Sequence, residues 1–214
     1  MDQDKVTKFY QFTLFGNFDA SSDESIIRAA SRRAYRDMCR TLRFVKGTTD
    51  KAKTDVYNET VEKVILSRIK DCYSITEEDK FSKWHKDTCE EIIKIYTEKE
   101  HSFSYGQAQK WVNMTLKYLA LFLDSSKLTD IYEFLHIPID SIIIEKAKKD
   151  FDIPPPAEEK IDQNKQKEVT WSNLSFGLYD KYQKDLMSKI GDMAPLDWEF
   201  NAWLETQNKE DQQE

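Results

Sequence analysis

Residues 104–113 read Ser-Tyr-Gly-Gln-Ala-Gln-Lys-Trp-Val-Asn, and they join two segments with helical patterning. A polar break at 99–104 precedes the stretch, and an apolar segment continues from it to about Leu123. Gly106 stands at the start of the second helix, where free backbone N–H groups can bind an anion such as a phosphate. Gly106 and Ala108 are small enough to let a sugar-phosphate backbone approach. The stretch therefore predicts a helical hairpin with an anion-binding turn.

Most of the remaining chain is also patterned for helices. Apolar residues recur at helical spacing over about 21–43, 49–72, 76–98, 105–123, 128–134, 140–150, 174–190 and 195–206. We expect a capping box at Ser21 and Glu24, an N-cap at Asp140 and Pro195 at a first helical position. Only residues 9–18 leave room for a short strand or ordered coil. The fold class is predicted to be all-α.

Composition narrows the class of protein further. The 214 residues include only five Gly and five Pro, which disfavours a turn-rich β-sandwich, and 13% are aromatic, which disfavours disorder. No apolar run reaches the roughly 18 residues needed to cross a bilayer, and no signal peptide is readable. Cys39, Cys72 and Cys89 form neither a disulfide framework nor a zinc motif. We expect a cytoplasmic protein of a bacterial or archaeal cell, without metal, cofactor or membrane contact.

Four parts are expected along the chain. Residues 1–150 form a helical core, and residues 151–170, with three consecutive prolines, form a polar connector. Residues 171–206 form C-terminal helices that pack back on the core, and residues 207–214 form a frayed acidic tail.

The charge is unevenly distributed. The formal net charge of −7 argues at first against a nucleic-acid partner. However, residues 151–214 hold 14 Asp and Glu against seven Lys and Arg, so residues 1–150 are neutral overall. Six of the seven arginines lie between Arg28 and Arg43, and Arg28, Arg32, Arg36 and Arg40 recur every four residues. This stripe predicts phosphate or carboxylate recognition, with a solvated helix face as the alternative.

The pattern resembles the helix-hairpin-helix DNA glycosylase superfamily over roughly residues 76–150. The matching hairpin residues are Gly106, Ala108, Lys110 and Asn113, and the second landmark is Ile137-Pro138-Ile139-Asp140-Ser141. Phe103-Ser104-Tyr105 stands where the superfamily usually has Leu-Pro-Gly, and Ala108 replaces a glycine. The separation of Lys110 from Asp140 is similar to that of the archaeal 8-oxoguanine glycosylase branch. A further resemblance is to a bacterial group of antiviral glycosylases that act on glucosylated hydroxymethylcytosine.

The resemblance implies a two-lobed helical fold that excises a modified base from double-stranded DNA. Asp140 would stabilise positive charge on the sugar, and Lys110 would be the amine nucleophile if the enzyme is also an AP lyase. The implied DNA contacts are Tyr105, Gly106, Gln107, Gln109, Asn113, Arg36 and Arg40. The extruded base would lie among Trp111, Met114 and Trp198, with Trp203 as a further candidate. A monomer is expected.

Each of these residues also has a plain structural interpretation. Asp140 could be an ordinary helix cap, Lys110 a solvated lysine, and the tryptophans core residues. The alternative functions are an 8-oxoguanine repair enzyme, an enzyme of anti-phage defence, and a helical module that binds nucleic acid or protein without catalysis.

Overall fold

The computed structural model describes residues 2–123, 125–159 and 166–210, and these residues are mostly helical. The helices are α1 (Gln3–Phe15), α2 (Asp23–Met38), α3 (Asp50–Thr60), α4 (Leu66–Cys72), α5 (Glu78–Glu98), α6 (Tyr105–Tyr118), α7 (Ser141–Phe151), α8 (Phe176–Ile190) and α9 (Pro195–Glu210). A π-helical turn joins α3 to α4, and another extends α6 over Leu119–Leu123. Residues Ser125–Phe134 form a 3₁₀ helix. The prediction of an all-α fold is confirmed.

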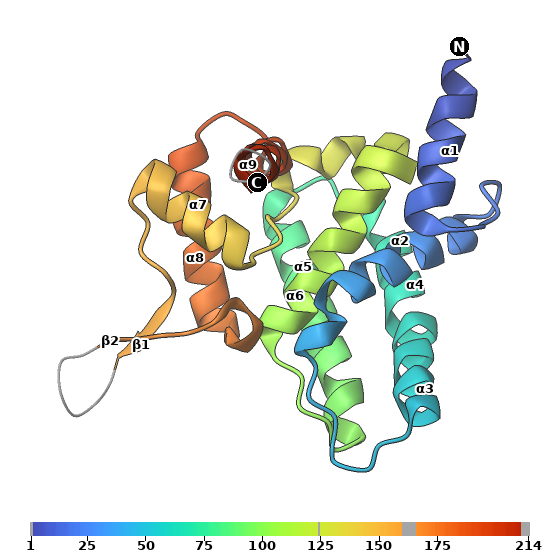
Figure 1. Ribbon diagram of the computed structural model, residues 1–214, viewed down its shortest axis with the longest axis horizontal. Coiled ribbons are helices and arrows are strands. Elements are labelled where there is room, and N and C mark those ends of the chain that lie inside the picture. The colour runs from blue at the N-terminus through green and yellow to red at the C-terminus, as the bar shows by residue number, and fades with distance from the viewer. Residues whose placement is uncertain (1, 124, 160–165, 211–214) are drawn as a thin grey trace.

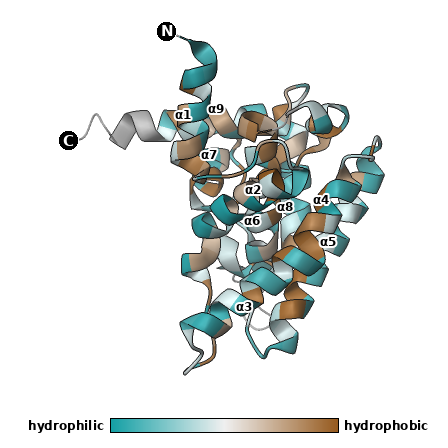
Figure 2. Ribbon diagram, turned by 90° about the vertical axis from the view of Figure 1, so that its right-hand side faces the viewer, coloured by the Kyte–Doolittle hydropathy of each residue, from teal (hydrophilic) through white to brown (hydrophobic). Residues whose placement is uncertain are grey.

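Helix α6 is the centre of the molecule. All 14 of its residues are buried, and it packs against α2, α5 and α8. Figure 1 shows α7 and α8 on one side of α6 and α3 and α4 on the other. The outer helices are amphipathic, as the hydrophobic and hydrophilic stripes along α4 and α5 show in Figure 2. Helix α6 therefore joins the packing of three other helices.

The helix starts follow from capping side chains. Ser104 accepts a hydrogen bond from the Gln107 N–H, and the Gln107 side chain accepts one from the Ser104 N–H, which completes a capping box for α6. Asp140 caps α7 through the Ile143 N–H, as predicted, and Pro195 opens α9. The cap of α2 is Ser22, whose side chain accepts from the Ser25 N–H, so the prediction of a capping box at Ser21 and Glu24 is wrong.

The N-terminal segment differs from the prediction. Residues 9–18 were expected as strand or coil, but Gln3–Phe15 form α1, capped by Asp2. Its last turn is fixed because Phe15 is buried and its carbonyl accepts a 2.7 Å hydrogen bond from Arg32 Nη2. Tertiary contacts therefore stabilise a helix that its short apolar pattern did not reveal.

Part of the predicted connector forms a two-stranded sheet. Strand β1 (Ala157–Glu159) pairs antiparallel with β2 (Gln166–Glu168), with Ala157 opposite Glu168. Figure 1 shows this hairpin projecting from the body below α8. Residues 160–165 of the connector and residues 211–214 of the predicted tail lie outside the described part of the chain. No helix among the described residues is long and apolar enough to cross a membrane.

Candidate active site

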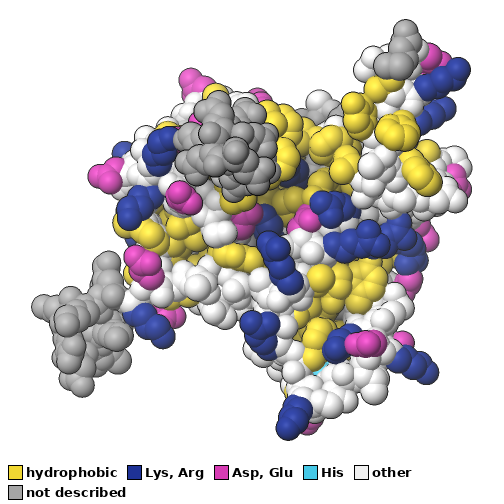
Figure 3. Space-filling view, in the orientation of Figure 1, with side chains coloured by type: hydrophobic (Ala, Val, Ile, Leu, Met, Phe, Trp, Pro, Cys, Tyr) yellow, Lys and Arg dark blue, Asp and Glu magenta, His cyan; other side chains and the backbone are white. Residues whose placement is uncertain are grey.

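A cleft of about 380 Å³ lies between α2, α6 and α9. Its charged lining residues are Arg33, Arg36, Asp37, Arg40, Lys110, Lys117, Asp140 and Glu199, and its apolar and aromatic ones are Leu14, Met114, Tyr118, Phe122, Phe200 and Trp203. Figure 3 shows Lys, Arg and hydrophobic side chains gathered on this face of the molecule. A cleft with apolar walls and a few convergent polar groups is typical of a ligand site.

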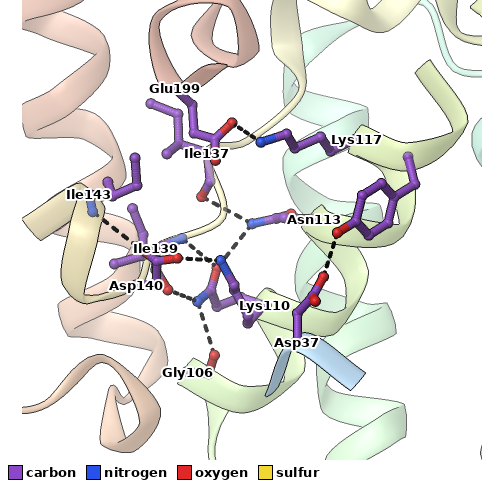
Figure 4. Close-up of polar contacts among 12 residues, drawn as sticks. Asp37, Gly106, Lys110, Asn113, Lys117, Ile137, Ile139, Asp140, Ile143 and Glu199 are labelled. Atoms are coloured by element: carbon purple, nitrogen blue, oxygen red, sulfur yellow. Dashed lines mark hydrogen bonds and ion pairs between the residues drawn. The ribbon is translucent and has the colours of Figure 1, made fainter. Parts of the chain in front are cut away.

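Lys110 and Asp140 form an ion pair at this cleft. Lys110 comes from the second turn of α6 and Asp140 from the N-cap of α7, 30 residues later. Lys110 Nζ lies 2.6 Å from Asp140 Oδ2, and the two side chains are 7% and 21% exposed. The other carboxylate oxygen accepts a 3.0 Å hydrogen bond from the Ile143 N–H (Figure 4). The structure thus brings together the two residues predicted as catalytic, and both border the cleft.

Two α6 amides hold the backbone in front of Asp140. The Gln109 side chain donates to the Ile139 carbonyl at 2.9 Å and accepts from the Ile139 N–H at 3.2 Å. Its amide therefore satisfies both backbone groups of Ile139. Asn113 Nδ2 donates to the Ile137 carbonyl at 3.3 Å (Figure 4). Pro138 cannot be helical interior, and these side chains satisfy the backbone groups that its extended neighbours expose. Gln109 and Asn113 therefore position Asp140.

A buried polar cluster lies behind this segment. His85 Nε2 lies 2.8 Å from Asn113 Oδ1, and His136 Nδ1 lies 2.9 Å from the Tyr179 hydroxyl. The two imidazole centroids are 4.7 Å apart. Burial lowers the pKa of His136 to about 4, and burial together with His136 lowers the pKa of His85 well below its ordinary value. Both imidazoles are thus neutral near pH 7, which suits a network of neutral hydrogen bonds.

A second ion pair closes one end of the cleft. Lys117, two turns beyond Lys110 on α6, pairs with Glu199 of α9, and both side chains are buried. Phe200 and the exposed Trp203 of α9 complete this wall. Of these four residues, only Trp203 was a predicted candidate; Lys117, Glu199 and Phe200 were not predicted. The seven-residue spacing of Lys110 and Lys117 places both on one helix face, and this was the available signal.

The arginine stripe divides into different roles. Arg36 and Arg40 line the cleft and are exposed, and within the described residues their guanidinium groups make no hydrogen bond or ion pair. Arg33 also lines it, and pairs with Asp37 at 3.2 Å. Arg28 pairs with Glu62, and Arg32 binds the end of α1. Only part of the predicted stripe is therefore free for an anion.

Five predicted DNA contacts have intramolecular roles instead. Tyr105, Gly106, Gln107, Gln109 and Asn113 are all buried. The Gly106 N–H donates to the Leu174 carbonyl at 3.0 Å, and a Cβ on Gly106 would lie 1.9 Å from the Trp171 carbonyl oxygen. The 3₁₀ turn Trp171–Asn173 thus occupies the place where we expected a phosphate. The start of α6 is closed by protein, and these residues cannot contact DNA in this arrangement.

The predicted base pocket needs a similar correction. Trp111 is fully buried, and its indole N–H donates to Ser31 while its ring stacks on Tyr57. Trp198 is buried against Phe151 and does not line the cleft. Met114 and Trp203, the further candidate, do line the cleft. Because an α-helix turns by about 100° per residue, Trp203, which follows Trp198 by five residues, faces a different side of α9.

The arrangement suits chemistry by an amine and a carboxylate. Among the described residues, no group of three or more His, Cys, Asp or Glu side chains could share a metal ion. Lys110 can donate or, when neutral, attack, and Asp140 can accept a proton or stabilise a cation. The positive end of α7 stabilises the Asp140 carboxylate.

The comparison of the chain with family models, curated proteins and solved structures gave no match.

Proposed function

We propose that the protein is a DNA glycosylase that excises a modified base from double-stranded DNA. The observation that carries this proposal is the Lys110–Asp140 pair, at 2.6 Å, in a cleft with free arginines on one side and aromatic residues on another. Breaking an N-glycosidic bond requires stabilisation of positive charge on the sugar, and the Asp140 carboxylate can provide it. The exposed guanidinium groups of Arg36 and Arg40 beside this pair favour a ligand with phosphate groups, such as a nucleotide, over a neutral metabolite.

The cleft offers a place for each part of an extruded nucleotide. Arg36 and Arg40 are exposed and can bind the phosphates on either side of the sugar. The base would lie between Met114 and the aromatic side chains of Phe200 and Trp203. The buried Lys117–Glu199 pair would close the end of that space beside the base. The sugar would then rest beside Lys110 and Asp140.

Two chemical routes are open to the pair. In the first, Asp140 orients a water molecule that attacks the sugar C1′ as the base leaves with a proton. In the second, Lys110 transfers one proton to Asp140 and its Nζ attacks C1′ as the bond to the base breaks. Asp140 gives that proton to the departing base, and a proton then passes from the nitrogen to the ring oxygen as the sugar opens to a Schiff base. The second route permits strand cleavage as an AP lyase, and the first does not.

Alkaline cleavage of modified DNA tests the activity. Duplexes with 8-oxoguanine, uracil, an alkylated purine or glucosylated hydroxymethylcytosine are incubated with the protein and heated with alkali. We expect labile sites on at least one substrate, and a loss of about 100-fold or more in rate for Asp140→Asn. Asn is also a good N-cap, so this variant should fold normally. Absence of labile sites on every duplex, with DNA binding retained, would favour a binding module that lacks catalysis.

Borohydride trapping separates the two routes. Reduction of a reacting wild-type complex should link the protein covalently to the DNA if Lys110 attacks the sugar. Lys110→Gln should abolish trapping, whereas Lys149→Gln, which changes an exposed lysine on α7, should leave it intact. Base excision without trapping of the wild type would assign the attack to water and leave Asp140 as the essential residue.

A further inference from the structure

Helix α1 exposes an unusual number of aromatic side chains. Phe9 is 67% exposed, and Tyr10 and Phe12 are each 61% exposed. In Figure 3, hydrophobic side chains lie along α1 where it projects from the body, close to Lys and Arg side chains. Exposed aromatic surface gathered on one element is a feature of interaction sites.

A groove of about 560 Å³ runs between α1 and α2. Phe9, Phe12 and Thr13 form its α1 side, and Arg32 and Arg36 form its α2 side. No Asp or Glu is among the described residues that line it. The groove therefore combines two exposed aromatic rings with two guanidinium groups and no opposing charge.

The groove adjoins the cleft, because Arg36 and Leu14 line both. The end of α1 is fixed beside the cleft, because Gln11 Nε2 donates to the Phe122 carbonyl at 2.7 Å and Phe15 packs on Tyr118 with ring centroids 5.5 Å apart. A chain of nucleotides that leaves the cleft past Arg36 thus enters the groove without crossing an acidic surface.

Aromatic rings beside cationic groups are the usual features of a surface for single-stranded nucleic acid, where bases stack on the rings and phosphates meet the cations. A protein partner would need no row of cations, and an intact duplex would keep its bases away from Phe9 and Phe12. We propose that the α1–α2 groove binds a short unpaired part of the DNA strand next to the extruded nucleotide. Phe9 and Phe12 would stack on its bases, and Arg36 would bind its phosphates. Arg32, whose Nη2 donates to the Phe15 carbonyl, would add positive charge through the rest of its guanidinium group. The location beside an extruded nucleotide rests on the proposed function.

Binding of a labelled oligonucleotide tests this inference. The affinity of a fluorescein-labelled 12-nucleotide single strand is compared with that of the same sequence in a duplex, for wild type and for a Phe9→Ala/Phe12→Ala variant. We expect the variant to lose about tenfold or more in affinity for the single strand and less than about threefold for the duplex. Tyr10→Ala is the matched control, because Tyr10 is an equally exposed ring on α1 that does not line the groove. It should bind the single strand within about twofold of wild type.

The failure of this inference differs from the failure of the proposed function. Equal single-strand affinity of wild type and the double variant overturns the groove proposal, even where base excision is observed. If the double variant loses affinity for the single strand and Tyr10→Ala does not, the groove proposal is supported, even where no tested duplex is cleaved. If sedimentation shows that the double variant only dissociates a dimer and binds DNA like wild type, α1 is a contact between copies of the chain and the proposal is wrong.

Discussion

Two adjacent stripes of α6 carry polar residues, and the structure uses them in opposite ways. Gly106, Gln109 and Asn113 form one stripe, which is sealed by the Trp171–Asn173 turn and the segment before Asp140. Lys110, Met114 and Lys117 form the other, which borders the cleft. Both stripes repeat every three or four residues, so spacing alone does not separate them. The neighbours that tertiary folding brings to each stripe decide whether it holds the protein together or faces a ligand.

The cleft stripe is itself divided. Lys110 pairs with Asp140, whose side chain is 21% exposed and has a second partner in the Ile143 N–H. Lys117 pairs with Glu199, and this pair is buried on both sides. A buried charge pair returns little net stability, but a buried charge without its partner is costly. At one end of this stripe, the Lys117–Glu199 pair therefore fixes α9 to the core. At the other end, the Lys110–Asp140 pair is open to a reacting group.

The largest effect on stability is expected at the closed end of the cleft stripe. Lys117→Met leaves Glu199 buried and unpaired, and should lower the free energy of unfolding by about 3–5 kcal/mol. Lys110→Met should cost no more than about 1.5 kcal/mol, because Asp140 remains partly hydrated. Urea unfolding measures both. The double variant Lys117→Met/Glu199→Leu should recover most of the loss, and equal costs at both lysines would contradict the division of the stripe.

The sealed stripe should be next most sensitive, at Gly106. A Cβ there would overlap the Trp171 carbonyl oxygen, which belongs to backbone and cannot rotate away. Gly106→Ala should therefore destabilise the protein by about 1–3 kcal/mol, as overpacking does elsewhere. Gly177→Ala is the matched control, because open space surrounds Gly177 in α8 and alanine favours a helix by about 0.5–1 kcal/mol. A neutral Gly106→Ala would mean that the turn at 171–173 moves away freely.

The buried histidines behind the sealed stripe predict a pH dependence. Their folded-state pKa values are depressed, that of His136 to about 4, so the folded protein binds fewer protons than the unfolded chain. Their contribution to stability is therefore present above about pH 6.5 and is lost as the pH falls towards 4. Each histidine should contribute a slope of up to about 1.4 kcal/mol per pH unit in that window. Urea unfolding at pH 7 and pH 5 should show the loss, and His136→Gln should reduce it.

The sequence predicts the helices better than it predicts the site. Asp140 and Pro195 mark helix starts through local chemistry, and both are found where expected, whereas the start of α2 is capped by Ser22 rather than by the expected Ser21. Lys110 and Asp140 were paired only through the family resemblance, and folding brings them to 2.6 Å. The sequence predicts that Trp198 and Trp203 lie at the site, but not which of them faces it. The orientation of α9 depends on contacts such as Lys117–Glu199, between residues 82 positions apart. A small residue such as Gly106 allows close approach of DNA or of the chain itself, and the sequence does not distinguish them.

The smallest expected effect separates the two roles of Asp140, as a helix cap and as the exposed partner of Lys110. Asp140→Ala removes both the hydrogen bond to the Ile143 N–H and the carboxylate, and should cost about 1 kcal/mol of stability. Asp140→Asn keeps a capping oxygen and should cost only a few tenths of a kcal/mol. Both should lose excision activity equally, so activity follows the charge and stability follows the cap. If Asp140→Asn retained the activity, the open end of the stripe would be a structural contact like the sealed one.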